Sequence, residues 1–235
     1  MKRIISIALV MLLLLSCTAC GSKDATDGKE PAAEKTSVNL GNSKDNTEPD
    51  KDSTKPITVS DVKNHEVSPE SDFECVNNGS GGLILVGYIG SDDIVVMPES
   101  INGKPIVEIN QRVFAQKPIR GIKLADSVET IGYISFAFCP NLEVVICGSG
   151  LKTIGKYAFQ TCASLREVEL NDGLEHILEC AFSGSMSLKS LVIPSSVITM
   201  EAPFVMMSSD FKIIGKAGSA AEAYAAEASI PFEAQ

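Results

Sequence analysis

His65 and His176 are the two histidines of this 235-residue chain and its first candidates for acid–base chemistry. A catalytic histidine needs a carboxylate that orients it and a nucleophile within reach. Glu175 precedes His176 and serines are plentiful, but adjacency along a chain does not build a triad. His65 lies close to a polar stretch that offers no scaffold to position a base. The sequence therefore predicts no catalytic residues and a protein that is not an enzyme.

Metal and phosphate binding are the next chemistries to test against the residue spacing. Structural zinc sites need two matched pairs of ligands, and no second Cys-x-x-Cys matches the one that ends at Cys20. Asp92-Asp93 lacks the alternating oxygen ligands of a calcium loop. Gly148-Ser149-Gly150 is not followed by the Lys-Ser/Thr of a phosphate loop. We expect neither a metal nor a cofactor.

The N-terminus has the pattern of a secretory signal. Lys2-Arg3 is followed by an apolar run of twelve residues, Ile4 to Leu15, interrupted only by Ser6, which rises about 18 Å as a helix, short of the roughly 30 Å bilayer core. Thr18-Ala19-Cys20-Gly21-Ser22 then resembles the bacterial lipobox, in which a signal peptide is cleaved before a cysteine that receives a diacylglycerol. This predicts a signal peptide over residues 1–19 and lipidation at Cys20, with Cys17 as the alternative acceptor.

A lipid on Cys20 predicts where the protein resides. Two acyl chains anchor a protein stably to a bilayer, whereas one chain binds reversibly. The membrane is therefore an expected partner through the covalent lipid at Cys20. We expect an extracytoplasmic protein that is anchored to a bacterial membrane and exposed at the cell surface.

The segment that follows Cys20 is polar. From Gly21 to Pro56 it consists mainly of Lys, Asp, Glu, Ser, Thr, Asn and Pro, with no aromatic residue. Such a composition does not bury enough apolar surface to offset chain entropy. The sequence predicts a disordered tether over residues 20–72 with a reach on the order of 40 Å.

The charge of the chain excludes one class of partner. Lys and Arg number 20 against 30 Asp and Glu, so the formal net charge is −10. Nucleic-acid binding needs a basic patch that neutralises phosphates. No basic cluster longer than Lys2-Arg3 occurs, so nucleic acid is not an expected partner.

Downstream of the tether, apolar residues recur with a period of 23. The repeat is visible only when the chain is compared with itself, because single units contain short apolar fragments. The first apolar column is Ile119, Leu142, Leu165, Leu188 and Phe211, and the aromatic column is Phe136, Phe159, Phe182 and, in the last unit, Val205.

Each unit has room for one short strand and a return segment. In one unit Val168 and Leu170 alternate with polar residues, which predicts a strand with one buried face, and Asn171-Asp172-Gly173 is a turn sequence. One unit cannot bury its apolar face alone, but stacked units form a continuous core. The predicted fold is therefore a mainly β solenoid with short helical or irregular return segments.

The segment Leu142–Leu165 has the pattern Leu-x-x-Val-x-Leu … Leu-x-x-Ile-Gly-x-x-Ala-Phe-x-x-Cys-x-x-Leu, with Cys147 at the third apolar position. This resembles the BspA-like, or Treponema-type, leucine-rich repeat. The resemblance extends over about 73–232. The pattern departs from the family at Val113-Phe114, which lacks the Ala before Phe, and at Glu201-Ala202-Pro203-Phe204, where Pro replaces Ala.

The family resemblance also implies closing units at both ends of the stack, as solenoids require. Segments 87–90 and 96–106 resemble its opening strand pair, and the Ala-rich run 217–225 resembles its closing helix. The expected organisation is an N-terminal β cap over 73–118, leucine-rich repeats over 119–210 and a helix-containing cap over 211–235.

Cys139 and Cys162 occupy the same position in adjacent units. Two interpretations remain open from the sequence. The thiols form a disulfide in an oxidising compartment, or they stack as free, small apolar side chains.

The side chains that flank the buried strand positions form the expected binding face. They carry mixed charge and two aliphatic residues, which favours a protein-recognition surface, with an ordinary solvated sheet as the alternative. The expected face comprises Arg120, Lys123, Glu143, Ile146, Arg166, Glu169, Lys189 and Val192.

The predicted function is a lipid-anchored cell-surface module that binds a protein or another macromolecule, and the family resemblance implies adhesion or host contact. Two alternatives remain open: a surface hydrolase or its accessory subunit, and an architectural envelope component without a specific ligand.

Overall fold

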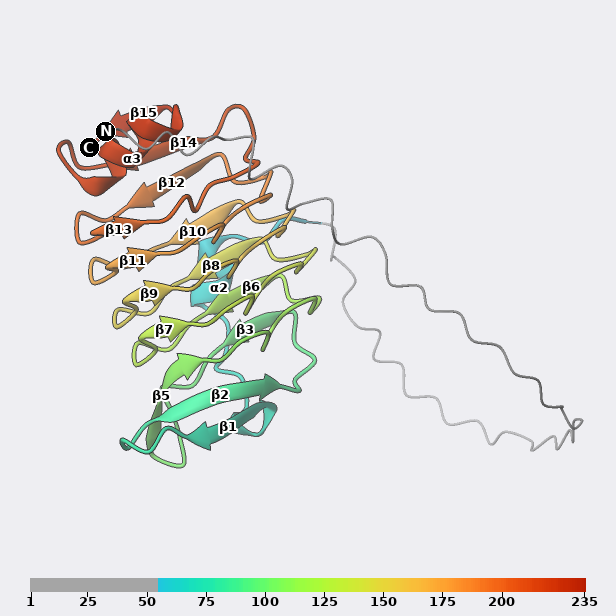
Figure 1. Ribbon diagram of the computed structural model, residues 1–235. Helices are drawn as coiled ribbons and strands as arrows, with labels where there is room; N and C mark the ends of the chain where they lie inside the picture. The colour runs from blue at the N-terminus through green and yellow to red at the C-terminus, as the bar shows by residue number, and fades with distance from the viewer. Residues whose placement is uncertain (1–54) are drawn as a thin grey trace, which may run out of the picture. The chain divides into compact units, whose positions relative to one another are not determined.

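The computed structural model describes residues 55–235. The predicted signal peptide, the lipidation site Cys20 with its alternative Cys17, and the tether up to residue 54 lie outside the described residues. The described part is a β-solenoid in which the strands that open the repeats and the strands that return lie in different sheets (Figure 1).

The first sheet collects the strand that opens each repeat. From β6 to β10 its register advances by 23 residues per strand, because Gly121 pairs with Val144 and Val144 with Glu167, whereas Ile94 of β3 pairs with Gly121, 27 residues later. All pairs are parallel, in the order β10-β8-β6-β3. The strands are β3 (Ile94–Val96), β6 (Gly121–Lys123), β8 (Val144–Ile146) and β10 (Glu167–Glu169). A further parallel sheet contains β12 (Ser190–Ile193), β14 (Lys212–Gly215) and β15 (Phe232–Ala234).

The second sheet collects the return strands, and it is antiparallel only at its N-terminal end. There β1 pairs with β2, and β4 pairs with β5, both antiparallel. The two-residue strands that follow are parallel, and His176 of β11 lies in register between Thr153 and Thr199. The strands are β1 (Phe73–Asn77), β2 (Leu83–Tyr88), β4 (Ser100–Ile101), β5 (Lys104–Ile109), β7 (Thr130–Ile131), β9 (Thr153–Ile154), β11 (His176–Ile177) and β13 (Thr199–Met200).

The core runs along the stack as a column of phenylalanine rings. Phe136 stacks on Phe159 at 5.0 Å and Phe159 on Phe182 at 5.3 Å between ring centroids, and all three are fully buried. The predicted column is confirmed for these units. Its last member is Phe204, at 5.6 Å from Phe182, and not Val205 as predicted. The last repeat is one residue shorter, which lets an aromatic ring continue the stack.

Close contact between successive coils also depends on glycine. A Cβ at Gly148 would lie 2.2 Å from the carbonyl oxygen of Ala125 in the preceding coil. Such a contact is shorter than van der Waals radii allow, so Gly148 is required for the spacing of this turn.

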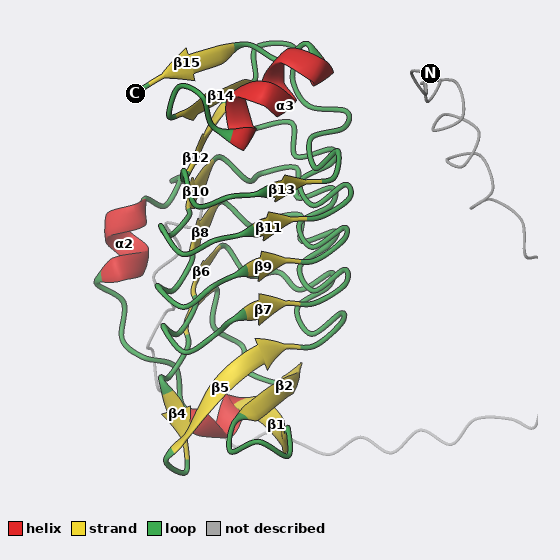
Figure 2. Cartoon of the chain, turned by 60° about the vertical axis from the view of Figure 1, so that its left-hand side comes forward, coloured by secondary structure: helices red, strands yellow, loops and turns green. Residues whose placement is uncertain are grey.

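Helix α3 (Ala220–Ala228) closes the C-terminal end of the stack against β14 (Figure 2). Its small side chains allow close approach, since Ala221 and Ala225 are buried in the core. The helix ends at Ser229, which has the left-handed conformation common after a helix C-terminus. A helix-containing C-terminal cap is therefore present.

Residues 55–72 differ from the predicted tether. They contain the five-residue helix α2 (Val59–Lys63) and the 3-10 turn η1 (Glu70–Asp72), and they lead directly into β1. A helix of five residues is unstable by itself in water. It forms here because Thr58 and Asp61 make a capping box and because Val62 is completely buried against the sheet. The prediction of a disordered tether is therefore wrong for residues 55–72.

Candidate functional site

The outward side of the strands that open the repeats, β3, β6, β8, β10 and the next strand β12, which we call the outer sheet face, carries apolar side chains that the solenoid core does not use. In β8, Val145 belongs to the main core, whereas Val144 and Ile146 belong to a separate buried cluster with Ile94 of β3. Side chains alternate between the two faces of a strand, so this second cluster lies outside the solenoid. It would be exposed if nothing covered it.

The cover is residues 55–63, which we call the strap. Its Ile57 and Val62 complete the outer cluster, with 7% and 0% of their surfaces exposed. Helix α2 contacts β3, β6 and β8 and lies beside β6 and β8 in Figure 2. The outer sheet face thus already binds a polypeptide segment, which belongs to the same chain.

Glycine at one position of β6 makes the seat for this segment. A Cβ at Gly121 would lie 2.7 Å from Cγ2 of Val62 and 2.9 Å from Cδ1 of Ile57. Glycine inside a strand weakens the strand and often marks a close approach by another chain segment. Its neighbours in the sheet register, Val144 among them, carry full side chains. Gly121 is therefore the recess into which both aliphatic strap residues fit.

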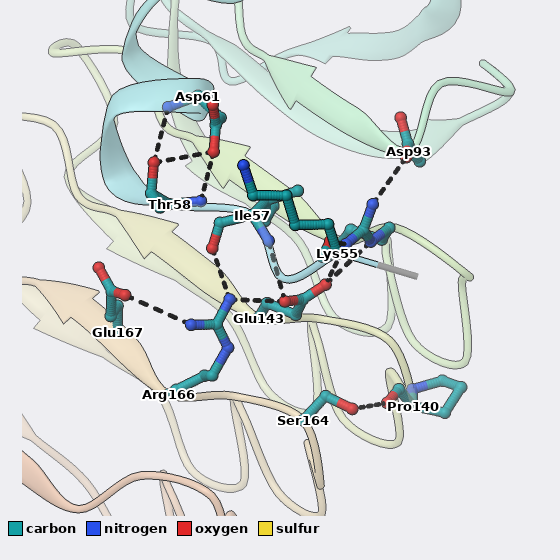
Figure 3. A network of polar contacts seen from close by, with 11 residues as sticks. Lys55, Ile57, Thr58, Asp61, Asp93, Pro140, Glu143, Ser164, Arg166 and Glu167 are labelled. Carbon is teal, nitrogen blue, oxygen red and sulfur yellow. Dashed lines mark hydrogen bonds and ion pairs between the residues drawn. The ribbon is translucent and has the colours of Figure 1, made fainter. Parts of the chain in front are cut away.

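A charged triad beside this recess holds the strap backbone (Figure 3). Arg120, Glu143 and Arg166 occupy the same position in three successive repeats. Arg120 Nη2 lies 2.7 Å from Glu143 Oε1, and Arg166 Nη2 lies 2.6 Å from Glu143 Oε2. The carboxylate therefore pairs with both guanidinium groups at once and orients them.

The same three side chains bind backbone groups of the strap. Arg120 donates to the carbonyl oxygen of Lys55 at 2.5 Å, and Arg166 donates to that of Ile57. The backbone N–H of Ile57 donates to Glu143 Oε2 at 3.2 Å. These bonds contact backbone atoms only, so they position an extended peptide without selecting its side chains.

The ionisation of Glu143 is set by two opposing effects. Burial favours the neutral carboxyl, but the hydrogen bonds from Arg166 and Arg120 stabilise the carboxylate more. The net result is a pKa of Glu143 below its usual value of 4.5. Glu143 therefore carries its negative charge at neutral pH.

Two further contacts surround the triad. Lys63, at the end of α2, pairs with Glu169 of β10 at 2.7 Å, and both side chains are about half exposed. Asp93 lies 3.8 Å from Arg120. Exposed pairs of this kind contribute little to stability, so the triad and the aliphatic recess hold the strap.

The residues predicted from the sequence divide into two groups. Five of the eight, Arg120, Glu143, Ile146, Arg166 and Glu169, contact the strap. Lys123 is partly buried in β6. Lys189 and Val192 lie beyond the strap, where Lys189 pairs with Asp210 at 2.8 Å and Val192 is 44% exposed.

Sequence reasoning missed the strap itself. The signal that could have found it is Thr58-Val59-Ser60-Asp61, a capping-box pattern, with Ile57 and Val62 as aliphatic residues on either side. The composition of the preceding residues concealed it, because the polar character of the tether was extended to residue 72.

The two histidines considered for catalysis lie in different places, and His65 lies just after the strap, with its Nδ1 3.1 Å from the carbonyl oxygen of Glu66. His176 lies on the second sheet, 3.7 Å from Glu175, and its side chain is 35% exposed. Among residues 55–235, no group of three His, Cys, Asp or Glu side chains is arranged to hold a metal ion.

The two aligned cysteines are free. Cys139 donates to the carbonyl of Phe114 at 3.0 Å and Cys162 to that of Phe136 at 3.1 Å. Ser185 makes the equivalent bond to Phe159 in the next unit. The column binds backbone carbonyls of the preceding coil, which favours the stacked-thiol interpretation over the disulfide. Burial and the charge of Glu169 raise the pKa of Cys147, which directly follows β8, to about 12.

These features define a leucine-rich repeat solenoid with a polypeptide segment bound on its first sheet. Residues 99–211 match the family model described as "BspA type Leucine rich repeat region", in six copies. The repeat region therefore belongs to the BspA-type leucine-rich repeat family, and it begins inside the segment predicted as the N-terminal cap. Within residues 55–235, no helix has the length and apolar character to cross a bilayer.

Solved structures of bacterial proteins have the same fold. The Treponema pallidum leucine-rich repeat protein TpLRR is 27% identical, with a TM-score of 0.60, and the match covers 63% of this chain and 71% of that one. A leucine-rich cell surface protein of Faecalibacterium prausnitzii is 20% identical, with a TM-score of 0.51 and coverage of 66% and 46%. The pneumococcal vaccine antigen PcpA is 18% identical, with a TM-score of 0.50 and coverage of 70% and 48%.

This chain thus spans less than half the length of the last two. No curated protein matches it in sequence.

Proposed function

We propose that this chain is a cell-surface recognition module that binds a protein or another macromolecule through its outer sheet face, in adhesion or host contact. One observation supports it above the others. The face holds a polypeptide segment with an aliphatic recess and a charged triad, which are the features of a protein-binding surface. The description of a similar protein from Faecalibacterium prausnitzii as a cell surface protein agrees with this role.

The proposal includes a lipid anchor at Cys20, which the lipobox-like sequence supports. Cells that express the full chain would be labelled with an alkyne fatty acid, fractionated and probed for the protein. We expect the label and the membrane association to disappear in Cys20→Ser and to persist in Cys17→Ser. Loss of the label in Cys17→Ser alone would place the lipid on Cys17, and absence of the label from the unmodified chain would reject the anchor.

Binding through the face would be tested on a biosensor against purified extracellular-matrix and bacterial surface proteins. The double variant Lys189→Glu/Val192→Asp changes the part of the face that the strap leaves exposed. Its matched control is Lys152→Glu/Ile198→Asp, which makes the same changes at exposed residues outside the face. We expect the first variant to abolish capture of a ligand and the control to retain it. Capture that survives the first variant would contradict the assignment.

A further inference from the structure

The strap points to the kind of partner and to its regulation. We infer that residues 55–63 are an internal peptide ligand, and that the outer sheet face binds a partner peptide of the same chemistry when the strap leaves. That peptide has an extended residue with an aliphatic side chain, followed five positions later by a second aliphatic residue on one turn of helix. The inference rests on the proposed function, because it names the partner class for the same face.

The first argument is that the polar contacts and the aliphatic recess have different roles in binding the strap. Arg120, Glu143 and Arg166 bind a carbonyl, an N–H and a second carbonyl of the bound segment, and such bonds are available to any peptide. The recess at Gly121 then selects the side chains, because Ile57 and Val62 fit closely against the position that a Cβ would occupy there. This combination is typical of peptide recognition, in which main-chain bonds hold the segment and pockets give specificity.

The second argument is that the strap can leave without disturbing the solenoid. Its aliphatic residues belong to a cluster separate from the main core. Residues 64–67 are exposed, with Val67 at 61%. The chain becomes fixed again at Ser68, whose backbone N–H and hydroxyl oxygen bond to Val96 of β3 at 2.9 and 3.2 Å. Release therefore stops at residue 68 and leaves the first sheet intact.

The third argument is competition. A partner peptide has to use the atoms that the strap already occupies. Its apparent association constant is therefore the intrinsic constant multiplied by the fraction of molecules in which the strap is released. Weakening the strap raises that fraction and tightens binding in trans. Filling the recess also releases the strap, but it removes the site as well. These two perturbations have opposite effects on partner binding, which makes the inference testable.

The probe is a synthetic fluorescent peptide of residues 53–66, titrated into the full chain by anisotropy. Val62→Asp weakens the strap and leaves the recess free, and Val67→Asp is the matched control at an exposed linker residue. We expect Val62→Asp to bind the peptide at least tenfold more tightly than the unmodified chain, and Val67→Asp to bind like the unmodified chain. A peptide that itself carries Val62→Asp should not bind.

Gly121→Val is the receptor-side variant. A side chain there displaces Val62 and Ile57 and fills their seat. Hydrogen exchange at Ile57 should accelerate in both Gly121→Val and Val62→Asp, while only Val62→Asp binds the peptide. Circular dichroism shows whether each variant is folded. If Val62→Asp does not fold, Thr58→Ala weakens the strap through its cap and leaves every residue of the recess unchanged.

The inference is overturned if peptide affinity is the same in Val62→Asp, Val67→Asp and the unmodified chain, or if Gly121→Val binds as tightly as Val62→Asp. A second copy of this chain is the other possible occupant of the outer sheet face, and light scattering tests it. A stable dimer of the unmodified chain would mean that the second copy supplies the strap. If the peptide experiment fails but ligand capture on the biosensor still depends on Lys189 and Val192, the proposed function stands without this inference. If the peptide binds as expected but ligand capture does not depend on Lys189 and Val192, the proposed function is contradicted instead.

Discussion

Removing the carboxylate of Glu143 should release the strap without unfolding the solenoid. Its side chain is 13% exposed and accepts bonds from two arginines and from the backbone N–H of Ile57. A hydrogen bond to a charged group contributes ~1.5–3 kcal/mol, and partial exposure of Arg166 reduces the effect. We expect Glu143→Ala to lower the free energy of strap opening by about 2 kcal/mol, equivalent to roughly 30-fold faster amide exchange.

The assay is native-state hydrogen exchange with residue resolution at Ile57 and Asp61. The amides of the Phe159 coil report on the solenoid and should exchange as slowly as in the unmodified protein. Glu129→Ala is the control, since that carboxylate forms an exposed pair with Lys152 at 2.9 Å. Unchanged protection at Ile57 in Glu143→Ala would refute the idea that the triad holds the strap. Equal acceleration throughout the stack would show that strap and solenoid unfold together.

Three further predictions concern the pH dependence of the site and the packing of the stack. The pKa of Glu143 is below 4.5, so its contribution to strap binding is present above that pH and disappears as the pH falls through the lowered pKa; NMR titration of the Ile57 amide should show release only in that acidic range, and release near pH 6 would contradict it. Phe159→Ala should lower the free energy of unfolding by ~3–5 kcal/mol in urea titrations, because the ring stacks on both neighbours and is fully buried. The exposed Phe138→Ala serves as control, and a loss as small as the control's would rule out the aromatic column. Gly148→Ala should destabilise by ~1–3 kcal/mol or more, since the new Cβ meets the backbone of Ala125; an unchanged thermal midpoint would show that the coils can separate there.

Most of the fold could be predicted from the sequence because each repeat has to bury apolar side chains at the same positions. Phe136, Phe159 and Phe182 recur at a fixed interval and are buried in one column, so periodicity alone located them. The last unit departed from that interval by one residue. The sequence offered Val205 at the expected position and Phe204 next to it, and stacking on Phe182 decided in favour of the ring.

The candidate site was only half predictable. Glu143 and Ile146 were identified because they flank the buried positions Leu142 and Val145 in the sequence, whereas the outward Val144 was not. What covers them did not follow, because a five-residue helix has little helical signal and depends on tertiary contacts for its stability. The recess at Gly121 was equally hidden, since its meaning comes from the 2.7 Å approach of Val62, which is distant in sequence.

Each repeat adds one strand to the sheet, and this limits how the surface can change in evolution. Inserting or deleting a whole repeat away from the triad lengthens or shortens the stack by one strand spacing, ~4.8 Å, and leaves every interior column aligned. Between Arg120 and Arg166 the same event would separate groups that act on one peptide. Gene duplication is therefore free to vary the length of this protein, but the three repeats that carry the triad have to be inherited as a block.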